Sequence, residues 1–333
     1  MSAAAGDPRP IISAQAAQRW QAIDPLLPAP GKLPSGCGAE LIVAGADGQP
    51  AAYGTCEHWE GEPGTLELAW GAARRFRLTT QIAGADVANA LDQLLSLWRD
   101  HLADVPGAEG EDTAAVVSWP SRDIDGIATL RRHGLTPMLV FAARATPAGP
   151  PRRAARPARS TLPATGSAAE GARIRRAGAA DIDVVNHLAM EVFRYDERLG
   201  GVIERPGTAD AMRREAAALL AGPQAWTWLA ERDGKTVGML TAHKPESAGS
   251  LAPLVRPAAA AYLFLAFIVA GERGSGIGSA LVAELHREID SAAVAVTLVD
   301  YEPANPLSVP FWSQHGYRPL WTSWEARPAR AIR

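Results

Sequence analysis

A glycine-rich turn with one arginine lies between an apolar run, Tyr262 to Val269, and a stretch of helix-forming residues. The turn runs from Arg273 to Ser279 and holds glycines at positions 274, 276 and 278. The first backbone N–H groups of a helix have no partner within the helix, and with the helix dipole they attract negative charge. Glycines let a phosphate approach the backbone, and the Arg273 guanidinium adds a full positive charge. The stretch therefore predicts a site for a diphosphate.

The spacing of the glycines narrows the choice of ligand. A dinucleotide fingerprint reads GxGxxG, with an acidic residue about 20 residues further on, and the alternating glycines here do not fit it. The Lys-Ser/Thr pair of a phosphate-binding P-loop is also missing. The pattern Arg273-x-x-Gly276-x-Gly278 after an apolar strand resembles the acyl-CoA signature of the GNAT superfamily of N-acyltransferases. The alternative is a strand-to-helix turn that binds no ligand.

A second motif strengthens this resemblance. Many GNAT domains end in Asn-x-x-Ala-x-x-Phe-Tyr-x-x-x-Gly-Phe, and this chain has Asn305, Ser308, Phe311, Trp312, Gly316 and Tyr317 at the same spacing. The resemblance spans roughly residues 172–327 and implies an acyl-CoA co-substrate, acetyl-CoA or a longer acyl thioester. It also implies a backbone donor to the thioester carbonyl at the strand end, and a contact of Asn305 with the pantetheine arm, compatible with a helix-capping role. The implied donor site comprises Ile268, Val269, Arg273, Gly274, Ser275, Gly276, Ile277, Gly278, Ser279, Asn305 and Trp312.

Two departures from the family pattern concern proton transfer. Trp312 stands where many members have the tyrosine that protonates the leaving thiolate, and an indole N–H is no acid near neutral pH. The strand from Tyr262 to Val269 also lacks the glutamate that many members use as general base. Water or other residues must therefore handle these protons.

Candidates for proton transfer and acceptor binding come from elements that the family fold places near the turn. Asp300 and Tyr301, at the end of the neighbouring predicted strand, are the candidate general bases, acting directly or through water. The loop predicted to cover the acceptor contains Asp196 and Glu197, and their negative charge indicates that the acceptor is a cationic amine. Each of these residues is alternatively a solvated polar residue. The candidate acceptor-binding residues are Glu191, Asp196, Glu197 and His243.

The elements that must position these residues follow the GNAT order. Hydrophobic periodicity and turn residues in the second half predict β-α-α-β-β-β-α-β-α-β, with a hairpin at Asp233-Gly234 and a helix capped by Asp181. The fold class predicted for each half is α/β (α+β), with a mixed, mostly antiparallel sheet flanked by helices.

The first half repeats the end of this plan. His133, Gly134 and Pro137 match His315, Gly316 and Pro319, each preceded by a predicted short helix and an apolar strand. We interpret the chain as a tandem duplication. Residues 1–145 form a degenerate copy, the Pro/Ala/Arg-rich segment 146–171 is a linker, and residues 172–333 form the catalytic copy. In an ungapped comparison Asp86 falls opposite Gly276, so a carboxylate, expected to cap a helix, stands where phosphates would bind.

Composition excludes several function classes. The formal net charge is −3, which does not favour nucleic acid as a partner. The longest apolar run, from Ala258 to Gly271, is shorter than the about 20 residues of a membrane-spanning helix. Cys37 and Cys56 form neither a metal cluster nor a disulfide framework. We expect a cytoplasmic protein without a resident metal, and the sequence leaves its oligomeric state open.

The leading hypothesis is an N-acyltransferase that moves an acyl group from coenzyme A to an amine of a small molecule or peptide. An acyl carrier protein is an alternative donor, because it presents the same phosphopantetheine arm, and Arg152, Arg153, Arg156 and Arg159 would offer it a basic surface. Alternatives are a mycothiol-synthase-like acetyltransferase, an enzyme of natural-product biosynthesis or resistance, and a non-catalytic acyl-CoA sensor. We expect the first half to bury a face of the catalytic half, or to supply part of the wall of the acceptor pocket.

Overall fold

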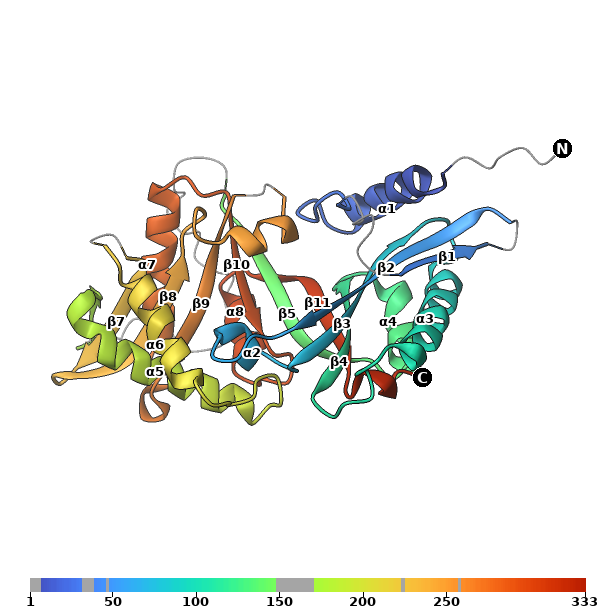
Figure 1. Ribbon diagram of the computed structural model, residues 1–333. Helices are drawn as coiled ribbons and strands as arrows, with labels where there is room; N and C mark the ends of the chain where they lie inside the picture. Colours follow the sequence, from blue (N-terminus) through green and yellow to red (C-terminus); the bar gives the residue numbers. More distant parts are fainter. Residues whose placement is uncertain (1–6, 32–38, 46–47, 148–170, 223–224, 257–258) are drawn as a thin grey trace.

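A computed structural model of the chain describes residues 7–31, 39–45, 48–147, 171–222, 225–256 and 259–333. The strands of these residues form one sheet of 11 strands in the order β1-β2-β3-β4-β11-β5-β10-β9-β8-β7-β6, which runs through both halves of the molecule (Figure 1). The fold is mixed α/β, as the sequence predicted. The Arg152–Arg159 cluster and almost the whole predicted linker lie outside the described residues.

Helices and strands are interspersed along both halves of the chain. The first half contains α1 (Arg9–Ile23), β1 (Glu40–Ala44), β2 (Pro50–Glu60), α2 (Leu66–Ala69), β3 (Arg74–Ile82), α3 (Val87–Asp104), β4 (Thr113–Pro120), α4 (Ile124–Arg132) and β5 (Thr136–Ala145). The second half contains β6 (Arg173–Arg176), α5 (Ile182–Glu197), α6 (Thr208–Leu219), β7 (Thr227–Arg232), β8 (Lys235–His243), β9 (Ala260–Ile268), α7 (Ile277–Ser291), β10 (Val296–Tyr301), α8 (Ser308–Gln314) and β11 (Arg318–Ala326).

The predicted element order of the second half is confirmed, with one local correction. The β7–β8 hairpin turns through Asp233 and Gly234, both at positive φ, as a tight two-residue hairpin requires. Asp181, however, does not cap α5 through its side chain. Its carboxylate instead accepts from the Gly178 N–H and forms an ion pair with Arg175, because β6 brings that guanidinium within 2.8 Å.

The last strands of the two halves are exchanged. β5 ends the first half but pairs antiparallel with β10, where Asp300 lies opposite Phe141. β11 ends the second half but pairs antiparallel with β4, where Ser323 lies opposite Ser118. The two exchanged strands also pair with each other, and β5, drawn in green, lies between β10 and β11 in Figure 1. Each half therefore completes the sheet of the other.

The sheet opens at one place in each half. β9 and β10 pair as parallel strands only from Ala260 to Leu263 and from Val296 to Val299. Beyond these residues β9 pairs only with β8, and β10 only with β5, so the two strands separate into a gap. β3 and β4 are likewise parallel and stop pairing after Leu78 and Val117.

Helices cover the sheet unequally. In the second half, α7 and α8 pack on one face and α5 and α6 on the other, each with its own buried apolar cluster. In the first half, α3 and α4 cover one face of β3 and β4. The other face, which carries Arg77, Thr79 and Ser118, lines a cavity. This asymmetry leaves an open sheet face beside the second half.

The strand exchange predicts that neither half folds alone. Deleting residues 1–145 removes β4 and β5, so β10 loses one ladder partner, β11 loses both, and unpaired edges are exposed. We expect fragment 146–333 to be insoluble when expressed alone and soluble when residues 1–145 are co-expressed, as measured by size-exclusion chromatography and circular dichroism. A soluble, cooperatively unfolding fragment 146–333 would contradict this account.

Candidate active site

One cavity of about 1730 Å³ joins the glycine turn, the gap between β9 and β10, and the open sheet face of the first half. Small-molecule sites usually measure about 300–1,000 Å³, so this cavity has room for two substrates. Its lining includes Gly276 and Phe264 from the second half and Trp70, Arg77 and Ser118 from the first. Both halves therefore contribute to one site.

The glycine turn has the conformation that an anion site needs. Gly274 and Gly276 have φ of 78° and 82°, the left-handed region that favours glycine. α7 begins at Ile277 without a side-chain cap, so its first N–H groups are free for an external acceptor. At Gly278 an added Cβ would lie 3.2 Å from the Phe311 ring, so glycine also allows α7 to approach α8.

Arg273 lies at the rim of this turn, next to Gly274. Its Nε donates to the Ile268 carbonyl at 3.1 Å, and its guanidinium carbon lies 5.5 Å from the centre of the Tyr195 ring. Within the described ranges no carboxylate forms an ion pair with it. The guanidinium is therefore oriented while its charge is uncompensated.

The end of β9 offers one backbone donor to the gap. Val269 donates its N–H to the Val237 carbonyl of β8. The residues next to this bond, Ile268 and Gly238, lie opposite each other in the antiparallel ladder. Because of the position of the bond, they form a non-hydrogen-bonded pair, and in such a pair the N–H groups point away from the partner strand. The Ile268 N–H therefore points towards the gap. Of the two predicted backbone donors, Ile268 is free, whereas Val269 already has a partner.

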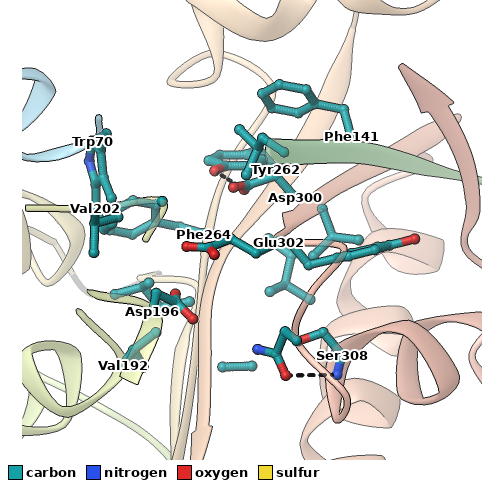
Figure 2. Close-up of a pocket in the computed structure, with 18 of the residues that line it drawn as sticks. Trp70, Phe141, Val192, Asp196, Val202, Tyr262, Phe264, Asp300, Glu302 and Ser308 are labelled. Carbon is teal, nitrogen blue, oxygen red and sulfur yellow. Dashed lines mark hydrogen bonds between the residues drawn. The ribbon is translucent and has the colours of Figure 1, made fainter. Parts of the chain in front are cut away.

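Asp300 reaches the cavity at the end of β10. The Tyr262 hydroxyl, from β9, donates a short hydrogen bond to its carboxylate across the parting strands (Figure 2). Burial raises the pKa of Asp300 to about 6, although the bond from Tyr262 opposes the rise. A carboxylate with such a pKa is ionised at neutral pH and accepts a proton more readily than an exposed one.

Two further carboxyl groups, Asp196 and Glu302, face the same space as Asp300 (Figure 2). Burial raises the pKa of each to about 7; the charge of Asp300 adds to the rise at Asp196, and that of Asp196 to the rise at Glu302. The Glu302 side chain fills the space where a Cβ on Gly201 would lie. A backbone hydrogen bond from Gly201 opposes the rise in the pKa of Glu302. Three crowded carboxyl groups make this part of the cavity suited to a cation.

Aromatic rings enclose the carboxyl cluster. Trp70, at the end of α2, lies 6.2 Å from Phe264 in an edge-to-face arrangement, and His243 lies 5.2 Å from Phe264. His243 also stacks on Tyr262 and lies 3.4 Å from Glu215, while burial lowers the pKa of its imidazole. An ammonium group fits such a cage, because ring faces and carboxylates both attract cations.

The remaining predicted residues fall into two groups. Three of them line the cavity, and two of these, Asn305 and Trp312, have structural partners. Asn305 Oδ1 accepts from the N–H groups of Leu307 and Ser308, Trp312 packs on Phe311 and Tyr317, and Tyr301 lies on the opposite face of β10 from Asp300. Burial raises the pKa of Tyr301, so its hydroxyl is not a base at neutral pH.

Glu191 and Glu197, which the sequence suggested as acceptor-binding residues, are not among the residues that line the cavity. Glu191 forms an ion pair with Arg194 one turn further along α5. Glu197 accepts from the Glu204 N–H and so fixes the loop that follows the helix. The residues of α5 that line the cavity are Val192, Tyr195 and Asp196.

Sequence reasoning missed Glu302, Tyr262 and Trp70. Glu302 was detectable, because it lies two residues after Asp300 and strand periodicity places such residues on one face. Tyr262 was recognised only as part of an apolar strand. Trp70 comes from the first half and carries no local signal.

The corresponding turn of the first half cannot form the same cradle. Asp86 caps α3, and its carboxylate accepts from the Asn89 N–H. The Gly84 N–H already has a partner, Gln15 Oε1 of α1. An anion would therefore meet a carboxylate and an occupied donor. The capping role predicted for Asp86 is confirmed.

Comparisons with known proteins agree with this geometry. Residues 189–317 match the model of the acetyltransferase (GNAT) family, so the second half contains a GNAT domain. A search among curated protein sequences finds no significant match. The structure is similar to a GCN5-related N-acetyltransferase from Sphaerobacter thermophilus, with a TM-score of 0.57 and 14% identity, over 97% of this chain and 92% of that chain. This similarity shows the fold of nearly the whole chain, both halves included.

Two further solved structures resemble the chain more distantly. An acetyltransferase of the GNAT family from Colwellia psychrerythraea has a TM-score of 0.47 and 10% identity, over 86% of this chain and 84% of that chain. A tandem GNAT protein from the clavulanic acid biosynthesis pathway has a TM-score of 0.39 and 14% identity, over 87% of this chain and 82% of that chain.

The part of the chain that the structure describes contains neither a membrane-spanning helix nor a cluster of metal ligands. No helix among the described residues has the length and apolarity to cross a membrane. No group of three or more His, Cys, Asp or Glu residues in the described ranges is arranged to hold a metal ion.

The buried carboxyl group of Glu302 predicts a pH-dependent stability. Its folded-state pKa is about 7, above that of an unfolded chain, so ionisation penalises the folded state increasingly as pH rises from about 4 to about 7. We expect Glu302→Gln to raise the free energy of unfolding by on the order of 2 kcal/mol at pH 8 and to leave it unchanged at pH 4. Urea unfolding at both pH values measures this, with exposed Glu62→Gln as the control. An equal effect of Glu302→Gln at both pH values would contradict the assignment.

Proposed function

We propose that the chain is an N-acyltransferase that moves an acyl group from a coenzyme A thioester to an amine, with its chemistry in the second half. The observation that carries this proposal is the meeting of an uncapped, glycine-rich helix start with buried carboxyl groups in one cavity. In this proposal residues 1–145 form a copy without its own cofactor site, and residues 172–333 form the catalytic copy, joined by segment 146–171. We place the reaction in the cytoplasm, which the scarcity of cysteines favours.

The thioester donor fits the second half at three points. The free N–H groups at the start of α7 and the Arg273 guanidinium suit the diphosphate. The gap between β9 and β10 suits the pantetheine arm. The Ile268 N–H, directed into this gap, suits the thioester carbonyl, where a backbone donor stabilises the developing negative charge. An acyl carrier protein, which presents the same arm, is the alternative donor.

The acceptor amine fits the carboxyl cluster. The amine nitrogen attacks the thioester carbonyl carbon, so that a C–N bond forms, the C–S bond breaks and the sulfur leaves as a thiolate. Asp300 takes the proton that the ammonium must lose, while Asp196 and Glu302 attract the cation beforehand. Trp312 supplies no acid, so we assign protonation of the thiolate to water. A natural-product amine or a peptide amine both satisfy this chemistry.

A non-catalytic acyl-CoA sensor is the second candidate. The observation that favours it is Trp312, which packs in the core where the family usually has an acidic hydroxyl. Incubation with acetyl-CoA and a panel of amines, with detection of free thiol, separates the two functions. The transferase releases thiol with at least one amine, whereas the sensor binds acetyl-CoA and releases thiol with none.

Arg273 is expected to contribute to donor affinity. Replacing it with methionine removes one charge-assisted contact to the diphosphate, so we expect the Kd for coenzyme A to rise about tenfold. Isothermal titration calorimetry measures this. Arg287→Met, on the exposed side of α7, is the control and should bind as the parent does. Equal affinity of Arg273→Met and the parent would contradict the assigned cradle.

Asp300 and Tyr262 are expected to control the pH dependence of turnover. Asp300→Asn should lower kcat/KM about 100-fold and abolish a rising limb with an apparent pKa of about 6, without changing the Kd for coenzyme A. Tyr262→Phe removes a bond that lowers the pKa of Asp300, so this limb should move to higher pH. A full pH profile of thiol release measures both effects. A parental profile in Asp300→Asn would rule out Asp300 as the base.

A further inference from the structure

We propose that the first half binds a remote anionic group of the acceptor, and that Arg77 is the residue that selects it. This inference rests on the proposed transferase function and extends it to the class of acceptor. The acceptor would be an extended molecule with an amine at one end and a carboxylate or phosphate at the other. The proposed anion subsite comprises Arg77, Thr79, Ser118 and Ser323.

The residues of the anion subsite lie on one sheet face. Arg77 and Thr79 are two residues apart on β3 and therefore point to the same side. Ser118 of β4 and Ser323 of β11 lie directly opposite each other in the ladder. All four line the same cavity as the carboxyl cluster. Alternate residues of these strands pack instead against α3 and α4.

Arg77 carries an uncompensated charge. It is exposed, and no ion pair of the described residues includes it. Glu57 lies opposite Arg77 on β2, but it is not within ion-pair distance and does not line the cavity. A guanidinium on the same sheet face as three hydroxyl groups offers several donors to an anion that lies between them, which suits carboxylate and phosphate oxygens.

Arg75 and Arg327 line the same part of the cavity as Arg77, together with one carboxylate, Glu325, which forms an ion pair with Arg327. Arg75, two residues before Arg77, donates to the backbone carbonyls of Glu67, Ala72 and Trp70 and so has a structural role. Burial, aided by the charges of Arg327 and Arg77 and opposed by that of Glu325, lowers the pKa of Arg75 to about 10. An anion bound beside Arg77 would relieve this repulsion.

The two ends of the cavity therefore have opposite charge preferences and are well separated. Asp300 lies on β10 and Arg77 on β3, four positions apart in the sheet order. At about 4.8 Å per strand the separation across the sheet is about 19 Å. An extended peptide covers about 3.3–3.6 Å per residue, so five or six residues span this distance. The large volume of the cavity accommodates an acceptor of such length beside the donor arm.

The test uses peptides of two to seven residues made of glycine and serine, each with a free N-terminal amine. Every length is prepared as the free acid and as the C-terminal amide, and the amide series is repeated with a terminal phosphoserine. Binding to the full chain is measured by calorimetry with coenzyme A present, and thiol release from acetyl-CoA is followed in parallel. The proteins are the parent, Arg77→Met, and Arg99→Met as a control on the exposed surface of α3.

We expect the free acids of about five residues to bind the parent about tenfold more tightly than the matched amides. Arg77→Met should remove this difference and leave amide binding unchanged, while Arg99→Met should preserve it. If the phosphoserine amides match the acids, the subsite accepts phosphate; if they bind like plain amides, it is specific for carboxylate. Because Arg77 is exposed, thermal unfolding should show an intact fold, and Ser118→Ala with Ser323→Ala provides a second, milder variant.

Three results would overturn the inference. The first is that the parent binds the free acids and the amides equally. The second is that Arg77→Met still prefers the free acids. The third is that no peptide binds. The parallel assay separates this inference from the transferase proposal. Equal thiol release with acids and amides rejects the anion subsite and keeps the transferase, whereas acid-selective binding without thiol release from any amine keeps the subsite and rejects the transferase.

Discussion

The antiparallel ladder between β10 and β5 is the interaction on which the rest of the structure depends. It places a strand of the first half beside the strand that carries Asp300, and it leaves β11 to pair with β4. The resulting sheet is continuous, so the two halves cannot separate without breaking backbone hydrogen bonds. Because the sheet is continuous, the open face of the first half lines the same cavity as the second half. The continuous sheet also brings Trp70 next to Phe264.

The two halves differ at the helix start beside the gap in each part of the sheet. The second half keeps a left-handed glycine at the start of α7 and a charged arginine at the rim. The first half has a carboxylate at the same helix position and uses its turn N–H to hold α1. In the proposed function, the one cofactor site lies in the second half, and the open face of the first half lines the acceptor end of the shared cavity.

The sequence contained the local features of the site but not its assembly. The glycine turn, the helix after it and the Asp233-Gly234 hairpin follow from local backbone preferences, and all three were predicted. The exchange was not, because β5 and β11 follow equivalent His-Gly motifs and either strand suits either partner locally. Choosing between Ile268 and Val269 as donor required the ladder register with β8. Glu191 and Asp196 look equivalent in the sequence, and only the packing of α5 decides that Asp196 faces the cavity.

The most direct measurement of the central claim is a crystal structure of the full chain with acetyl-CoA. We expect the diphosphate on the free N–H groups at the start of α7, and the acetyl carbonyl at the Ile268 N–H in the gap between β9 and β10. We also expect an open path from the acetyl group to Asp300 and Trp70. Coenzyme A bound at the start of α3, or an acetyl group outside that gap, would contradict this claim.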